Sequence, residues 1–274
     1  MNSDHTACRF LCSISCVFLV SLSLFALPAL AQLEDAEWLE SCRAQIGTQF
    51  DFPDDPDTGA PNHVTADVQT GGGGVTAEVH HPGSGPPAVS SMVNAFLEIA
   101  NTLDGEARGE ILSGIRIVPK ASPPAVTEWV PFSMRASGSA SASSAGDFSG
   151  VASANVVLME GSRVMQTWGV TARSPDGPSE AGFEETGNFF ILPDVEMTVV
   201  VTATSSVEAF SATGSGTATS TADPVFEISS DPIPGDGRSF NEVYEFEYSP
   251  GYWALGGTPF QPTTWGGLKR SYSH

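Results

Sequence analysis

Cysteine is scarce in this chain, and its scarcity excludes one way of stabilising a fold. Of four cysteines, only Cys42 lies beyond the first 31 residues; the others are Cys8, Cys12 and Cys16. If those first residues are removed on export, the remaining chain has a single thiol and forms no internal disulfide. We therefore expect its stability to come from packing and to be insensitive to reductant.

The first 31 residues have the features of a secretory signal peptide. Arg9 precedes an apolar stretch from Phe10 to Leu27, and Pro28 follows, with Ala-Leu-Ala at 29–31. Small residues at this point suit cleavage by signal peptidase. We expect a secreted protein, extracellular or at the cell surface, that begins near Gln32. The alternative is an uncleaved membrane anchor, because the apolar stretch approaches spanning length.

Positive charge is also scarce. The chain has 11 Lys and Arg residues against 32 Asp and Glu, which gives a formal net charge of −21 at pH 7. This acidity disfavours nucleic acid and anionic membrane surfaces as partners. It suits a salty or calcium-containing exterior, where screening of carboxylate repulsion would stabilise the folded state.

Motifs for catalysis and cofactor binding are missing. The sequence has no Gly-x-Ser-x-Gly, Cys-x-x-Cys or His-Glu-x-x-His, and no Gly-rich phosphate-binding loop before a helix. Elbow-type hydrolases, dithiol redox proteins, zincins and nucleotide-binding enzymes are therefore disfavoured. The chain is more typical of a non-catalytic protein than of an enzyme, and we assign no catalytic residue or cofactor.

What the chain has in abundance is alternation with a period of two. From Val130 to Ser143, one parity is apolar and tapers from Val and Phe to Ala and Gly, while the other is mostly Ser. The same pattern recurs at 195–203 and 212–222, and it predicts strands with one buried and one exposed face. About nine or ten such strands, separated by turn residues, predict a mainly β protein, an antiparallel β-sandwich or jelly roll.

Helix is predicted only in the N-terminal half. Residues Leu33–Ile46 place Cys42 on an apolar helical stripe, where we expect a buried thiol, and Ser91–Gly105 begin with a serine N-cap and end with a glycine. The predicted organisation is a signal peptide at 1–31, a helix and acidic linker at 32–62, and a β-sandwich domain at 63–274 with a helix inserted near 91–104.

Residues 187–252 carry a family resemblance. A strand, a Ser/Thr/Ala-rich return strand, ADPVFEI at 222–228 and the turn YSPGY at 248–252 follow in this order. The order is similar to the closing part of exported bacterial proteins of the PEP-CTERM group. The resemblance implies a fold and a compartment rather than an activity. The chain ends in GGLKRSYSH, without the Pro-Glu-Pro, apolar anchor and basic cluster of that group's sorting signal.

A hairpin around Gly71–Gly74 gives the sharpest prediction of a site. With these four glycines as the turn, Asp67 faces Glu78 on the polar face. His63 and His80 share this face as diagonal neighbours of each other. Opposed carboxylates repel, and a divalent cation such as calcium, bound by the four side chains, would relieve the repulsion. The alternative is a solvated outer face.

Three other segments have a composition that suggests ligand binding. The sequence FDFPDDPDTG at 50–59 has the closely spaced acids of a calcium loop without its closing Glu, and a solvated acidic linker is the alternative. Tyr252, Trp253 and Trp265 would stack on sugar rings or, alternatively, close the core. The threonines at 213, 217, 219 and 221 form a partial array like those that bind ice, although β-propensity explains them adequately.

The sequence thus predicts a secreted, acidic, monomeric β-sandwich without catalytic activity. The alternative is a jelly-roll protein that binds or cleaves extracellular polysaccharide. In that case Glu242, Glu245 and Glu247 are the candidate carboxylates for glycoside cleavage, close in sequence to the C-terminal aromatics.

Overall fold

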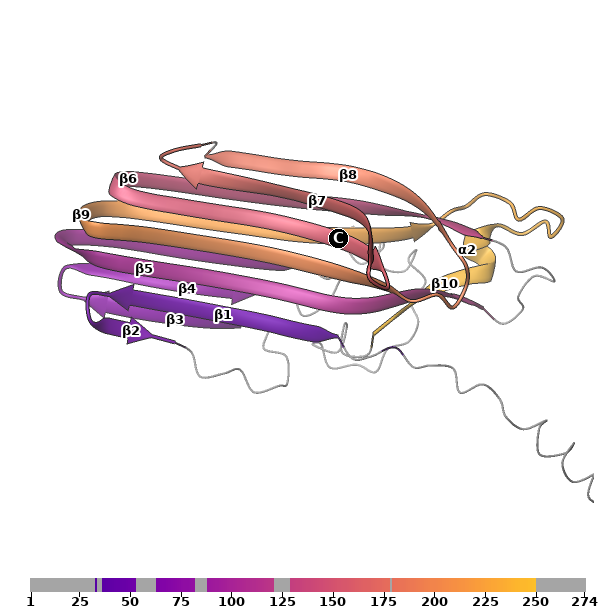
Figure 1. Cartoon of the computed structure of the whole chain (residues 1–274), viewed down its shortest axis with the longest axis horizontal. Coiled ribbons are helices and arrows are strands. Elements are labelled where there is room, and N and C mark those ends of the chain that lie inside the picture. Colours follow the sequence, from indigo (N-terminus) through magenta and orange to yellow (C-terminus); the bar gives the residue numbers. More distant parts are fainter. Residues whose placement is uncertain are drawn as a thin grey trace, which may run out of the picture. The chain divides into compact units, whose positions relative to one another are not determined.

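The computed structural model describes residues 33, 36–52, 63–81, 88–120, 129–177 and 179–249, most of which lie in one antiparallel sheet of ten strands (Figure 1). The elements are β1 (Glu37–Ile46), β2 (Gln49–Asp51), β3 (His63–Thr70), β4 (Gly73–His80), β5 (Val89–Pro119), β6 (Val130–Glu160), β7 (Arg163–Ser174), β8 (Glu180–Ile191), β9 (Met197–Ile228), the short helix α2 (Phe240–Val243) and β10 (Tyr244–Tyr248).

Three of the strands are far longer than a usual strand. β5, β6 and β9 contain 31 or 32 residues each, against a typical length of about 5–6. Their pairing is interrupted by register shifts, between Leu97 and Leu103 in β5 and between Gly146 and Phe148 in β6. At these interruptions the three strands turn over together, so that the sheet folds double into two layers (Figure 1).

Glycine makes the fold in the sheet possible. Gly146 has φ of +74° and Gly214 has φ of +143°, conformations that L side chains rarely adopt. These two residues face each other across β6 and β9. A Cβ at either one would lie within 2.3 Å of a carbonyl oxygen of the neighbouring strand. The turned-over end therefore requires glycine at both positions.

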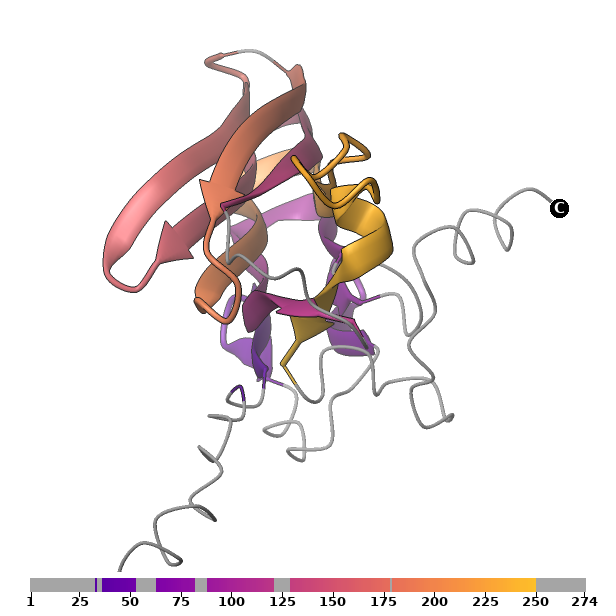
Figure 2. The same cartoon turned by 90° about the vertical axis from the view of Figure 1, so that its right-hand side faces the viewer.

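The two layers, named here A and B, share the long strands. Layer A has the order β2-β1-β5-β9-β6-β7 and contains residues 103–119, 197–209 and 148–160 of the long strands, with β10 beside β5. Layer B has the order β3-β4-β5-β9-β6-β8 and contains residues 89–97, 214–228 and 130–146. Figure 2 shows the two layers end-on.

The interior between the layers is filled by alternate residues of each strand. At one end the buried residues are bulky and include Ile111, Phe132 and Met197. Towards the turned-over end they are mostly alanine and valine around Phe148. Hydrogen bonds of 2.8 Å join Ser91 to Ser205 and Ser220 in the middle of the interior. The decrease in apolar side-chain size along Val130–Ser143 therefore follows the core from its thick end to its thin end.

The predicted sandwich is confirmed, and its jelly-roll variant stays a prediction. Both predicted helices are wrong. Residues Glu37–Ile46 form β1 and residues 91–105 lie within β5. The glycine taken as a helix stop, Gly105, instead lets the layers approach, because a Cβ there would lie 2.7 Å from Val75 and from Val93. Strands β1 and β2 pair in the sheet, so the sandwich starts before residue 63.

Candidate functional site

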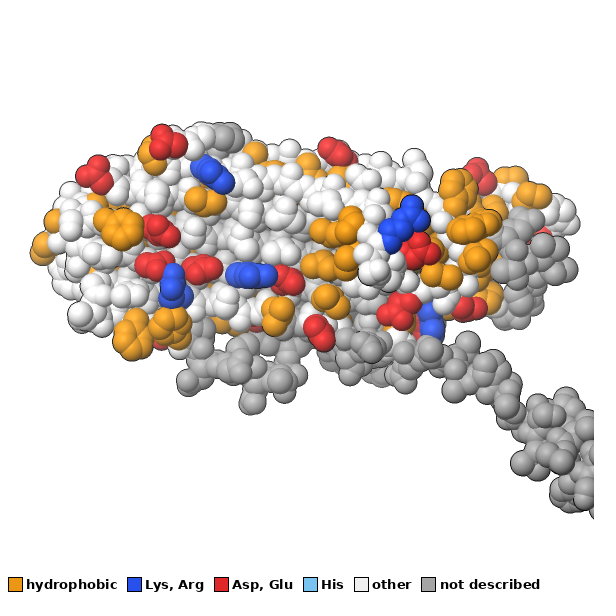
Figure 3. Space-filling view, viewed as in Figure 1, with side chains coloured by type: hydrophobic (Ala, Val, Ile, Leu, Met, Phe, Trp, Pro, Cys, Tyr) orange, Lys and Arg blue, Asp and Glu red, His pale blue; other side chains and the backbone are white. Residues whose placement is uncertain are grey.

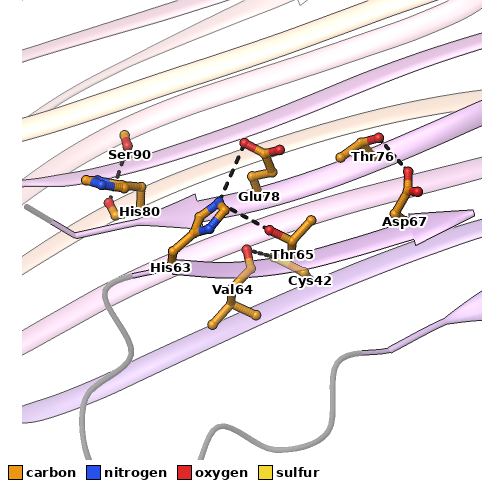
Figure 4. Close-up of polar contacts among 9 residues, drawn as sticks. All are labelled: Cys42, His63, Val64, Thr65, Asp67, Thr76, Glu78, His80 and Ser90. Carbon is orange, nitrogen blue, oxygen red and sulfur yellow. Dashed lines mark hydrogen bonds and ion pairs between the residues drawn. The ribbon is translucent and has the colours of Figure 1, made fainter.

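The predicted hairpin forms, but its turn and register differ from the prediction. Gly71 and Gly72 alone make the turn, so that His63 pairs with His80 and Asp67 pairs with Thr76. Glu78 faces Thr65 instead of Asp67. The predicted opposition of two carboxylates is wrong because a two-residue turn moves the register by two positions. A shift by two preserves the face, so all four candidate side chains stay on the outer surface of layer B (Figure 4).

Two histidines and one acid of the predicted metal set are neighbours, whereas the fourth residue is bound elsewhere. His63 Nε2 lies 3.7 Å from Glu78 Oε2, and the rings of His63 and His80 have centroids 6.1 Å apart. Asp67 Oδ1 accepts hydrogen bonds from Thr76 Oγ1 at 2.7 Å and Gln69 Nε2 at 2.8 Å. Within the described ranges, no three His, Cys, Asp or Glu side chains are grouped to hold a metal ion.

A buried acid–base pair lies between the layers and was not predicted. His81 Nε2 lies 2.5 Å from Glu40 Oε1, and the two side chains are 0% and 2% exposed. Glu40 is opposite Gly109 in β5, where a Cβ would lie 3.6 Å from the His81 ring and 2.6–2.7 Å from Val89 and Val79. The glycine therefore makes room for the pair. Alternation along β1 places Glu40 on the same side as Cys42 and Ala44. This is the only sequence signal that Glu40 points inward.

Cys42 is the next inward residue of β1. Its Sγ donates a hydrogen bond to the carbonyl oxygen of Val64 at 3.4 Å, which links layer A to layer B. Burial, and secondarily the charge of Glu40, raises the pKa of the Cys42 thiol to about 12. A thiol that stays protonated is a poor nucleophile. The predicted buried role of Cys42 is confirmed, although in a strand rather than in a helix.

The outer surface of layer A carries ion pairs (Figure 3). Arg43 pairs with Asp104 and, at 3.6 Å, with Glu106, and Arg108 Nη2 lies 2.7 Å from Glu110 Oε2. These groups lie on the neighbouring strands β1 and β5, and their charges partly compensate one another.

The outer surface of layer B is rich in hydroxyl groups at its centre. The threonine positions 217, 219 and 221 lie on one face of β9, as the alternation predicts, and the hydroxyls of β6 lie beside them. Ser139 and Thr221 are joined by a hydrogen bond of 2.8 Å, and Ser143 and Thr217 by one of 2.7 Å. In the stretches 90–94, 217–221 and 139–143, the outward positions carry no charge; they are Ser90, Met92, Asn94, Thr217, Thr219, Thr221, Ser139, Ser141 and Ser143.

The remaining candidates are structural or lie outside the described residues. Glu242 accepts a hydrogen bond of 2.7 Å from the backbone of Ser239 and so caps α2, which lowers the pKa of Glu242. Glu247 pairs with Arg116 at 2.7 Å. Tyr252, Trp253 and Trp265 lie outside the described residues, as do positions 53–59 of the acidic segment.

No family model matches the chain, and no curated protein matches it. No described helix has the length and apolar character needed to cross a bilayer.

Proposed function

We propose that this chain is an exported, non-catalytic β-sandwich protein that works outside the cell or on its surface, in the manner of the PEP-CTERM group that residues 187–252 resemble. The observation that carries the proposal is the position of three side chains of types that enzymes often use in catalysis. Glu40, Cys42 and His81 lie in the interior, where they join the two layers instead of facing a substrate.

The exported state is tested by N-terminal sequencing. The full chain, produced in a bacterial host with a working secretory pathway, should be recovered outside the cytoplasm with its N-terminus near Gln32. An Ala31→Arg variant should retain residues 1–31, because signal peptidase requires a small residue there. Recovery of wild-type protein that still carries residues 1–31 would contradict the proposal.

A second candidate function is binding of a neutral polysaccharide, and the centre of layer B favours it. The uncharged hydroxyl surface is unusual in a chain with a net charge of −21. Hydroxyl groups on three adjacent strands offer both donors and acceptors to an extended polyhydroxylated chain. A neutral ligand avoids the repulsion that this acidic protein would exert on anionic glycans.

Co-sedimentation with insoluble neutral polysaccharides tests this second function. Thr219→Glu places a charge at the centre of the hydroxyl surface and should weaken binding about tenfold, because a charge desolvated against a neutral ligand is unfavourable. Thr202→Glu is the matched control, since Thr202 occupies an outward position of the same strand in layer A. Equal loss in both variants, or no sedimentation of wild type, would reject the candidate.

A further inference from the structure

One long side of the sandwich ends in two strands whose outer edges have no partner strand in the described part of the chain. β7 closes layer A and β8 closes layer B, and each pairs only with β6. An edge strand presents a row of backbone N–H and C=O groups that can pair with another strand. β7 and β8 contain 12 residues each, so these edges are long.

The charges on the two edges are opposite in sign. β7 is uncharged from Val164 to Ala172 and has an arginine near each end, Arg163 and Arg173. β8 has three glutamates, Glu180, Glu184 and Glu185, and no basic residue. The only ion pair among these five within the described structure joins Glu184 to Arg135 of β6 at 3.6 Å.

Hydrogen bonds across the interior show that Arg173 of β7 and Glu180 of β8 lie at the same height along the strand direction. The side chain of Ser91 is hydrogen-bonded to those of Ser205 in layer A and Ser220 in layer B. Ser205 and Ser220 therefore lie at the same height along the strands, each in its own layer. Ser205 pairs with Ala152 of β6 and Ser220 pairs with Ala140. The next residues of β6, Val151 and Ser141, pair with Arg173 and Glu180 respectively.

We propose that a second copy of this chain pairs along this side, with β7 of each copy against β8 of the other. A two-fold axis parallel to the strands exchanges the layers and preserves the level of each residue. It therefore sets Arg173 opposite Glu180 of the partner copy, twice in one closed interface. β7 and β8 run in opposite directions, so the new pairs are antiparallel and extend both layers.

The charges select this arrangement over the two alternatives. Pairing β7 with β7 in antiparallel overlap puts Arg163 beside Arg173 at both ends. Pairing β8 with β8 gathers Glu184 and Glu185 of both copies at the centre. Like charges opposite one another destabilise a strand pair, and opposite charges stabilise it. Only the pairing of β7 with β8 brings arginine to glutamate.

Exposed apolar side chains lie towards the other end of the same two strands. Val164 is 54% exposed and Phe190 is 63% exposed. Pairing β7 with β8 of a second copy would bring these residues together and cover them, which adds a hydrophobic contribution to association. The sequence alone predicts a monomer, because the edges become visible only when β7 and β8 are placed in different layers.

Charge reversal tests the proposed dimer in the exported chain by analytical ultracentrifugation at micromolar concentration. Wild type should sediment at twice the mass of one chain at physiological ionic strength, where the long-range repulsion between two copies of net charge −21 is screened. Arg173→Glu and Glu180→Arg should each weaken self-association about tenfold, because like charges then meet twice per interface. A mixture of the two variants should form a heterodimer, since each reversed charge meets its opposite.

Arg108→Glu is the matched control, because Arg108 is exposed on β5, away from both edges. It should leave the dimer unchanged. Circular dichroism of each variant establishes that it is folded. A monomeric wild type at physiological ionic strength, an Arg173→Glu protein that associates as tightly as wild type, or a variant mixture that stays monomeric would each overturn the proposal.

Discussion

The two long sides of the sandwich are held together by different interactions. On the side of β1 to β4, the layers are joined by polar contacts: Cys42 to the Val64 carbonyl, the Asp67 amide to Asp51, and Glu40 to His81. On the side of β7 and β8, they meet through aromatic rings, with Trp168 and Phe189 in edge contact at 6.5 Å. We refer to these as the polar side and the aromatic side.

The difference follows from the space available between the layers. The polar side belongs largely to the part of the core made mostly of alanine and valine, where the backbones lie close enough for short polar groups to bridge them. The aromatic side belongs to the bulkier part, where rings fill a wider space. Asp51 also satisfies a backbone donor of the edge strand β3 on the polar side, whereas no strand of the described residues pairs with the outer edges of β7 and β8.

The largest expected effect comes from removing the buried carboxylate of the polar side. Glu40→Ala leaves His81 in the interior without its acidic partner and should lower the free energy of unfolding by about 3–5 kcal/mol. Urea denaturation at neutral pH measures the loss. Glu106→Ala is the control, since its pair with Arg43 lies on the surface and should contribute about 1 kcal/mol or less. Equal losses would mean that the buried pair does not join the layers.

A smaller effect is expected on the aromatic side. Phe189 stacks on Phe132 with centroids 5.2 Å apart and meets the edge of Trp168. Phe189→Leu keeps an apolar side chain and removes both ring contacts, which should cost about 1–3 kcal/mol. Thermal or urea unfolding measures it. Phe190→Leu, on the exposed side of the same strand, should change stability little in the monomer, and a reversed order of the two losses would contradict the comparison.

The sequence predicted the faces of the strands better than their partners. Alternation located the strands and the inward position of Cys42, because a period of two is a local property. At 91–105 the residues Met92, Phe96 and Ile99 also fit a helical stripe, and the choice between the two patterns depends on pairing with β4 and β9, which are distant in sequence. The four glycines allowed two turns, and the tighter one was formed, which displaced Asp67 from Glu78.

Prediction of the candidate site was limited in the same way, by contacts between residues that are distant in sequence. The inward parity of Glu40 was readable only once β1 was known to be a strand, and its partner His81 comes from another strand in the other layer. The unpaired edges of β7 and β8 could not be predicted from the sequence either, because consecutive strands of equal length usually pair with each other as a hairpin. Here each pairs with a different half of β6, because β6 is long enough to pass through both layers.

Removing a hydrogen bond at the edge of the polar side should have a still smaller effect. Asp51 Oδ2 accepts the backbone N–H of Asp67 at 2.8 Å in an exposed position. Asp51→Ala should lower stability by about 1 kcal/mol and speed hydrogen exchange at the Asp67 amide, while the amide of Val68 on the same strand serves as reference. Unchanged exchange at Asp67 would show that the contact does not protect this edge.

The smallest effect at neutral pH, and one that grows in alkali, is expected at Cys42. Its folded-state pKa is raised from 9.0 to about 12, so below pH 9 the thiol is protonated in both states and contributes no pH dependence. Between pH 9 and 12 the unfolded chain loses this proton while the folded chain keeps it, so stability falls as pH rises. Cys42→Ala removes that part of the slope, and unfolding curves of the two proteins should converge from neutral pH towards pH 11. Parallel stability profiles over this range would mean that the thiol ionises as readily in the folded chain as in the unfolded one, and that the polar side is not closed around it.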